Sequence, residues 1–336
     1  MRGITVGLIL SGYVGGCTAS TNNTTPPTAT SGDPSCLTAG QAVVTVHAGA
    51  VEDFAVAASG VYFVGEKSLM RVPLQGGQAT SINILPARGS LAIYGTQLFS
   101  FANDGAIASS SVAGTGMVKI AKRPSDPPLR VGGGLVASWG ELVDIGLGVS
   151  SSFSIPPSAV VYEVASASDG AYYSVTVAGV ARIVHVSREG AVVATIVELE
   201  TTPPSIAVDD DFIYYTVPGK LGFVRAHHDG SQRQTLGDRV VVHLALTEDS
   251  VYSVSHAANS QSASAPETWL VGDEISRYRK NDGVTTVLVN AQARPENLQV
   301  FGGNLYWSIP DRGSPLSSSA GVKVPAPGVG IMTMCR

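Results

Sequence analysis

A short frame recurs along this 336-residue chain and constrains its fold more than any other feature. The frame is an apolar residue with apolar or small neighbours, about four turn-forming residues, and then an apolar residue followed by tyrosine or another aromatic residue. The copies are separated by 37, 38, 35, 42, 38 and 54 residues, so they repeat a unit of roughly forty residues. They begin at Phe54, Leu91, Leu129, Val164, Ile206, Leu244 and Leu298.

Each unit is predicted to hold four short strands. The frame itself is one hairpin, and a second follows, with Gly-Gly or Asp-Gly turns at Gly76, Gly230 and Gly283. A low charged fraction of 14%, with 38 Gly and 19 Pro residues, fits short strands and tight turns. Since one twisted sheet cannot bury both its faces, such units close into a ring. We therefore predict an all-β fold, a single β-propeller over residues 40–336, with seven blades preferred and six or eight possible.

Two of the units resemble a known repeat. The segments VYFVGEKSLMRVPLQGGQATSI, from Val61, and IAVDDDFIYYTVPGKLGFVRAHHDGSQRQTL, from Ile206, are similar to the YWTD-type and TolB-like repeats of extracellular and periplasmic propellers. The resemblance implies a propeller for Phe54 to Cys335, and in those relatives six-bladed closure is usual. The chain departs from that repeat in two ways. The unit at Leu129 lacks the aromatic residue, and the tryptophan of the repeat occurs in this frame only at Trp307. The repeat serves binding, scaffolding and occasionally catalysis, so it does not define a function.

The N-terminus is predicted to be an export signal, residues 1–16, with one Arg followed by a short, largely apolar segment. Its end, Val14-Gly15-Gly16-Cys17, resembles the bacterial lipobox, which implies cleavage before Cys17 and lipid attachment to that residue. An ordinary signal peptide cleaved elsewhere remains the alternative. Residues 17–39 are rich in Thr, Ser and Pro without apolar periodicity, so they are predicted to form a flexible tether.

The two other cysteines, Cys36 and Cys335, lie just before the first strand and at the penultimate position. In an exported protein such a pair can form a disulfide. The segment from Gln41 to Gly49 is predicted to pair beside the C-terminal strand Gly330 to Met334. This pairing and a Cys36–Cys335 disulfide would close the ring.

Metal, cofactor and nucleic-acid functions are not favoured by the sequence. The formal charge of -5 and a pI near 5.7 lack the basic surface that nucleic acids require. Neither the turn Asp209-Asp210-Asp211 nor the pair His227-His228 has the companions of a calcium or transition-metal site. No nucleophile elbow, phosphate loop or dinucleotide fingerprint occurs in a suitable context. We expect no cofactor and no metal.

Loop length gives the candidate binding face. The connections between the second and third strands are longer in the last two units, over 255–274 and 308–321. Propeller geometry places both connections on one face. Long loops are uncommon unless they bind or cover something, although these Ser- and Ala-rich insertions also fit plain surface decoration. The candidate binding residues are Trp269, Asp273, Glu274, Asp311 and Arg312.

The preferred functional hypothesis is a lipoprotein propeller that is anchored in the bacterial cell envelope and acts as a monomeric, non-enzymatic binding or scaffolding platform. Its partner would be a protein, peptide or glycan, and it would meet the membrane only through its lipid. Two alternatives stay open: a secreted hydrolase or lyase with its site at the channel mouth, and a structural component of the envelope.

Overall fold

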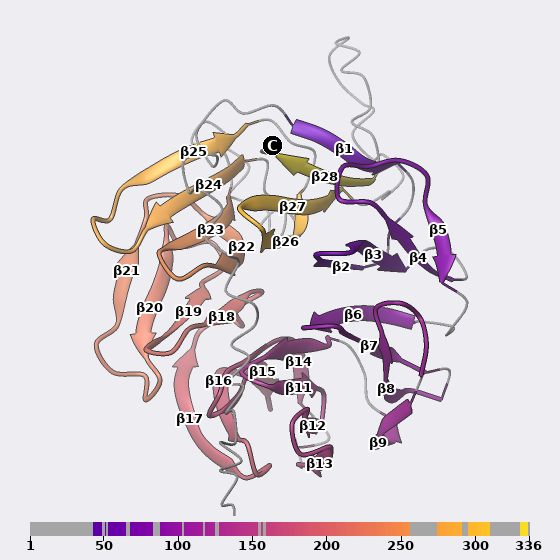
Figure 1. The fold of residues 1–336 in the computed structure, drawn as a ribbon. Coiled ribbons are helices and arrows are strands. Elements are labelled where there is room, and N and C mark those ends of the chain that lie inside the picture. Colours follow the sequence, from indigo (N-terminus) through magenta and orange to yellow (C-terminus); the bar gives the residue numbers. More distant parts are fainter. Residues whose placement is uncertain are drawn as a thin grey trace, which may run out of the picture.

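The computed structural model describes residues between 43 and 334, and the predicted all-β propeller is confirmed. The gaps are residues 49–50, 52, 65–67, 83–87, 103, 117, 125–127, 154–155, 157–158, 256–273, 291–294 and 310–329. Every regular element in the described part is a β-strand, and the strands form seven four-stranded sheets arranged around a central axis (Figure 1). Within this part, no helix has the length and apolar character needed to span a membrane.

Six sheets are consecutive antiparallel meanders, numbered here as blades in chain order. Blade 1 contains β2(Phe54–Ala57), β3(Gly60–Val64), β4(Leu69–Val72) and β5(Thr80–Ile82), and blade 2 contains β6(Arg88–Tyr94), β7(Gln97–Phe101), β8(Ala106–Ser111) and β9(Val118–Pro124). Blade 3 contains β10(Arg130–Gly132), β11(Leu135–Ser138), β12(Glu141–Asp144) and β13(Val149–Ser152), and blade 4 contains β14(Val160–Ser166), β15(Gly170–Val177), β16(Val180–Ser187) and β17(Val192–Leu199). Blade 5 contains β18(Ile206–Val208), β19(Phe212–Thr216), β20(Phe223–His227) and β21(Gln234–Leu236), and blade 6 contains β22(Val241–Leu246), β23(Ser250–Ser255), β24(Glu274–Arg279) and β25(Thr285–Val289).

Blade 7 closes the ring with strands from both ends of the chain. It consists of β26(Glu296–Phe301), β27(Asn304–Ile309), β28(Gly330–Met334) and, outermost, β1(Val43–Ala48). Strands β1 and β28 are antiparallel, with Val43 opposite Met334 and Ala48 opposite Gly330. The predicted pairing of the N-terminal segment with the C-terminal strand is therefore confirmed, whereas Cys17, Cys36 and Cys335 lie outside the described residues.

The paired aromatic residues of the frame pack on opposite faces of a blade. In blade 4, Tyr172 joins a core cluster shared with blade 5, while its neighbour Tyr173 joins one shared with blade 3. In blade 5, Tyr215 faces blade 4 and Tyr214 faces blade 6. Successive strand residues point to opposite faces, so one doublet fills two blade junctions. This explains why aromatic residues recur at this place in most of the units.

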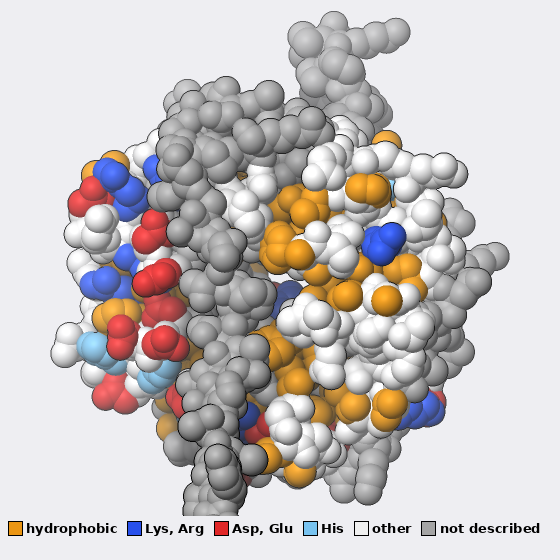
Figure 2. All heavy atoms as spheres, in the orientation of Figure 1, with side chains coloured by type: hydrophobic (Ala, Val, Ile, Leu, Met, Phe, Trp, Pro, Cys, Tyr) orange, Lys and Arg blue, Asp and Glu red, His pale blue; other side chains and the backbone are white. Residues whose placement is uncertain are grey.

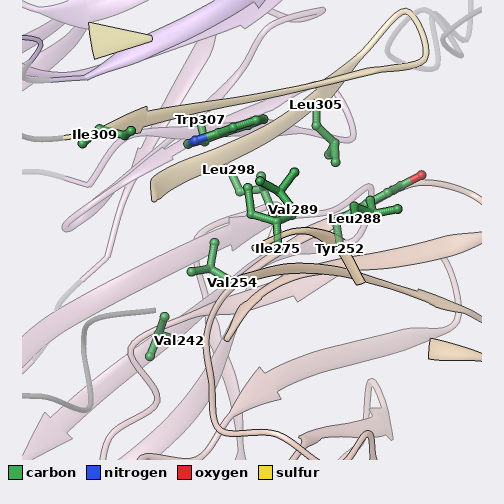
Figure 3. Packing of buried hydrophobic residues seen from close by; sticks show 10 residues of the cluster. All are labelled: Val242, Tyr252, Val254, Ile275, Leu288, Val289, Leu298, Leu305, Trp307 and Ile309. Atoms are coloured by element: carbon green, nitrogen blue, oxygen red, sulfur yellow. The ribbon is translucent and has the colours of Figure 1, made fainter. Parts of the chain in front are cut away.

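The junction between blades 6 and 7 shows how the core is divided (Figure 3). Val254 and Ile275 from blade 6 pack against Leu305 and Trp307 from blade 7, and all four are essentially unexposed. The hydrophobic core is thus a series of such junction clusters around the ring rather than one central core. Stability of each blade depends on contact with both neighbours.

Replacing Gly133 with alanine is expected to destabilise the junction between blades 3 and 4 by about 2–4 kcal/mol. Gly133 has a φ of +56°, and a Cβ there would lie 2.2 Å from the backbone of Ala167 and Ser168 in the next blade. Gly95 occupies the equivalent turn of blade 2 with a φ of +61° and nothing within 4 Å, so Gly95→Ala is the matched control. Urea denaturation should show a loss of only about 1 kcal/mol for the control. Equal losses for the two variants would contradict this account of the junction.

Candidate functional site

The inner strands of all the described blades line a central cavity of about 350 Å³. Figure 2 shows the hollow at the centre of one face, with a basic side chain visible inside it. Because each inner strand contributes the start of the repeated frame, equivalent positions of successive units meet around the cavity. We call the residue just before each frame the leading position, which is Asp53 in the first unit. The second residue of each frame is the lumen position, which is Ala55 in the first unit.

The lumen position is alanine in five of the seven units, and all seven lumen residues line the cavity. Small side chains at this position leave space at the axis. The exceptions are Arg130 in blade 3 and Gln299 in blade 7. The Nε2 atom of Gln299 donates a hydrogen bond of 2.6 Å to the Phe54 carbonyl of blade 1. The leading position carries mostly polar residues: Asp53, Ser90, Pro128, Glu163, Ser205, His243 and Asn297.

Arg130 and Glu163 form an ion pair inside the cavity. The Nη2 atom of Arg130 donates to the Glu163 carboxylate at 3.1 Å, and Nη1 donates to the Leu129 carbonyl at 3.0 Å. The Arg130 side chain is 35% exposed and that of Glu163 is 13% exposed, so Arg130 is the more accessible of the two residues. Although burial acts against its charge, the carboxylates of Glu163 and Asp53 outweigh this effect and raise the pKa of Arg130.

Asp53 links two blades through the backbone. Its Oδ1 accepts from the Phe54 amide at 2.8 Å, and its Oδ2 accepts from the Leu91 amide of blade 2 at 2.9 Å. Ser205 repeats the second bond, because its Oγ accepts from the Leu244 amide of blade 6 at 3.1 Å. Burial raises the pKa of Asp53 to about 6, against the opposing effects of Arg130 and the two amides. The leading position therefore has a structural role at these two junctions.

Replacing Asp53 with asparagine is expected to remove one pH-dependent part of the stability. A carboxyl group with a raised pKa binds its proton more tightly in the folded state. Its contribution to the free energy of unfolding is therefore fully present below pH 3.8 and is lost as the pH rises to about 6. The difference between the two pKa values corresponds to about 3 kcal/mol of folding stability. We would measure urea unfolding of both proteins across this window. The stability of the wild type relative to Asp53→Asn should fall with rising pH, and a constant difference would contradict the assignment.

His243 provides a neutral polar group beside the ion pair. Burial, with a smaller effect from the nearby charge of Arg130, lowers the pKa of His243 to about 4. The imidazole is therefore neutral at neutral pH. Within the described part of the chain, its ring makes no hydrogen bond, which leaves one donor and one acceptor available to the cavity.

The sequence did not single out these cavity residues. Asp53, Arg130, Glu163 and His243 lie in four different units and share no local motif. A signal was present in the frame itself, since Arg130 interrupts a run of alanines at the lumen position. Aligning the units by their apolar start, and reading the positions on either side of it, could have found them.

Of the five predicted binding-face residues, the structure describes Glu274. Glu274 is buried, with 3% of its surface exposed, and its carboxylate forms an ion pair with Arg239. The carboxylate also accepts hydrogen bonds from Ser276 Oγ at 2.8 Å and from Ser255 Oγ at 3.4 Å. This carboxylate is thus used within blade 6. Outside the described residues lie Trp269, Asp273, Asp311 and Arg312, so the binding face as a whole stays a prediction.

The acidic and histidine turns considered for metals hold neighbouring blades together. The Asp209 carboxylate forms an ion pair with Lys280 Nζ of blade 6 at 2.7 Å. The Asp169 carboxylate of blade 4 lies 3.4 Å from His228 Nδ1 of blade 5. The Tyr172 hydroxyl also donates to Asp169 at 2.8 Å. Among the described residues, no group of three or more His, Cys, Asp or Glu side chains is suited to hold a metal ion.

Comparison with known proteins supports the fold alone. No family model matches the chain, and no curated protein matches it. The solved structure of YCF48 bound to D1 peptide is similar over 88% of this chain and 96% of that one, with a TM-score of 0.58 and 11% identity. The computationally designed Ika8 protein is similar over 88% and 100%, with a TM-score of 0.54 and 12% identity. A chain of the mitotic checkpoint complex is similar over 81% and 89%, with a TM-score of 0.56 and 11% identity. The chain therefore has a β-propeller fold.

Proposed function

We propose that this protein is a lipoprotein anchored in the bacterial cell envelope through Cys17, and that its propeller is a non-enzymatic platform for a protein, peptide or glycan partner. The partner places one group into the central cavity. The observation that carries this proposal is the partly exposed Arg130 side chain, held by Glu163 in a cavity of about 350 Å³. A concave, pre-formed cavity with a few polar groups is the usual form of a binding site. The peptide-bound state of the similar YCF48 propeller is consistent with such a use.

Binding is favoured over catalysis by the spacing of the cavity groups. A general acid or base must lie within hydrogen-bond reach of its reacting partner. Among the described residues, Arg130 and Glu163 are the titratable pair in the cavity at that distance, and both carboxylate oxygens of Asp53 accept backbone amides. These contacts order the site, as a binding platform requires.

Affinity capture tests the proposal. A soluble form of the mature chain, residues 18–336 without the lipid-bearing Cys17 and with a C-terminal tag, would capture partners from a detergent extract of the native envelope. Loss of a charged hydrogen-bond donor should lower recovery by about tenfold in Arg130→Gln. Arg182→Gln is the matched control, because Arg182 forms an ion pair of similar length, 2.9 Å, with Glu198 on blade 4 away from the cavity. Equal recovery by both variants, or no partner above a tag-only sample, would overturn the proposal.

The predicted binding face and the lipid anchor have separate tests. Ser255 and Glu274 are directly paired strand residues, so residues 256–273 can be replaced by a short turn without moving the strands. Capture unchanged by this replacement would remove the loop from the proposed face. For the anchor, Cys17→Ser should move the protein from the membrane to the soluble fraction, and an unacylated protein that stays membrane-bound would exclude the lipid.

A further inference from the structure

We infer that the central cavity binds an uncharged, polyhydroxylated group, namely one sugar residue of a glycan. This inference rests on the proposed function and specifies its ligand. It is carried by three observations: the charges in the cavity already have partners, the free hydrogen-bonding groups are both donors and acceptors, and the space at the axis fits a small ligand.

Each charged group in the cavity already has a hydrogen-bonding partner. The Arg130 guanidinium is paired with Glu163, and the Asp53 carboxylate accepts the amides of Phe54 and Leu91. A charged ligand would have to be desolvated and to compete with one of these existing partners. Desolvation of an ion costs several kcal/mol unless a counter-charge is free to receive it. An uncharged ligand avoids that cost.

The remaining hydrogen-bonding capacity is mixed. Arg130 has five N–H donors, of which the Leu129 carbonyl and Glu163 occupy part. The Glu163 oxygens retain acceptor capacity, and the neutral His243 ring contributes one donor and one acceptor. A hydroxyl group donates and accepts at once, so neighbouring hydroxyls on a sugar ring can satisfy groups of both kinds.

The dimensions favour a single ring. A volume of about 350 Å³ lies near the lower limit of ligand pockets, which span roughly 300–1,000 Å³. Alanine at most lumen positions keeps the axis open beside Arg130. The cavity is thus suited to the terminal or a projecting residue of a glycan rather than to a long segment.

The test compares sugars that share a ring and differ in charge. Saturation-transfer NMR on the mature chain would use glucose, galactose and mannose, each beside its 2-amino sugar and its uronic acid. At least one neutral hexose should bind, and its charged counterparts should bind about tenfold more weakly. Arg130→Gln should abolish the signal, and Arg182→Gln should retain it. Binding of none of the neutral hexoses, or equal or tighter binding of the charged sugars, would overturn the inference.

The outcome is separable from that of the capture experiment. If Arg130-dependent capture of a partner persists while no neutral hexose binds, the platform stands and the carbohydrate inference falls. If a neutral hexose binds through Arg130 while no partner is captured, the inference stands and the platform falls.

Discussion

Replacing Trp307 with alanine is expected to lower the free energy of unfolding by about 3–5 kcal/mol. Trp307 is unexposed in the junction cluster of blades 6 and 7, where it packs with Leu298, Leu305 and Ile275 (Figure 3). The truncation would remove the largest buried side chain of the molecule's described part and leave a cavity between two blades. Urea denaturation followed by far-ultraviolet circular dichroism measures the loss without relying on the tryptophan signal.

The matched variant for this prediction is Trp307→Phe. The indole Nε1 of Trp307 is buried and has no hydrogen-bond partner among the described residues, so phenylalanine removes this donor and keeps most of the apolar surface. We expect this variant to lose less than about 2 kcal/mol. A loss below about 1 kcal/mol for Trp307→Ala would show that the junction does not depend on this side chain.

Removing β1 is expected to destabilise the ring on the order of 5 kcal/mol, from lost strand pairing and lost burial together. A chain beginning after Ala48 would leave β28 without its outer partner and would expose the junction cluster that Val46 helps to form with Phe54 and Tyr306. Thermal unfolding of this chain and of the mature chain would measure the change.

Two controls separate the strand from the segment before it. A chain beginning at Gln41 keeps β1 and should match the mature chain if the preceding residues contribute nothing to closure. A synthetic peptide of residues 41–49 added to the truncated chain should restore part of the stability. Equal melting temperatures for the chains with and without β1 would refute the proposed closure.

The architecture could be predicted because the repeat is a physical requirement of each blade. The frame recurs because each blade needs an apolar inner strand and a second strand whose neighbouring residues fill both junctions, as Tyr214 and Tyr215 do in blade 5. The pairing of residues 41–49 with the C-terminal strand could also be predicted, because strand-like segments remained at both ends of the repeat. Local pattern alone was enough for these conclusions.

The candidate site could not be predicted in the same way. Asp53, Arg130, Glu163 and His243 are brought together by closure of the ring, and no short stretch of sequence contains two of them. Loop length instead pointed to residues such as Glu274, whose carboxylate lies within blade 6 with Arg239. Whether a carboxylate at a strand end faces a loop or a buried partner depends on contacts between distant segments, which sequence spacing does not encode.

The closed ring on which the cavity depends can be tested directly through the register of β1 and β28. Val44 lies opposite Thr333, so the double variant Val44→Cys and Thr333→Cys, with the native cysteines replaced by serine, should form a disulfide in the folded protein. Moving the second cysteine one residue, to Met332, gives the control. Mass spectrometry under non-reducing conditions should find the first pair cross-linked in high yield and the second pair much less so. Free thiols at both positions of the first pair in the folded protein would contradict the ring and the cavity it encloses.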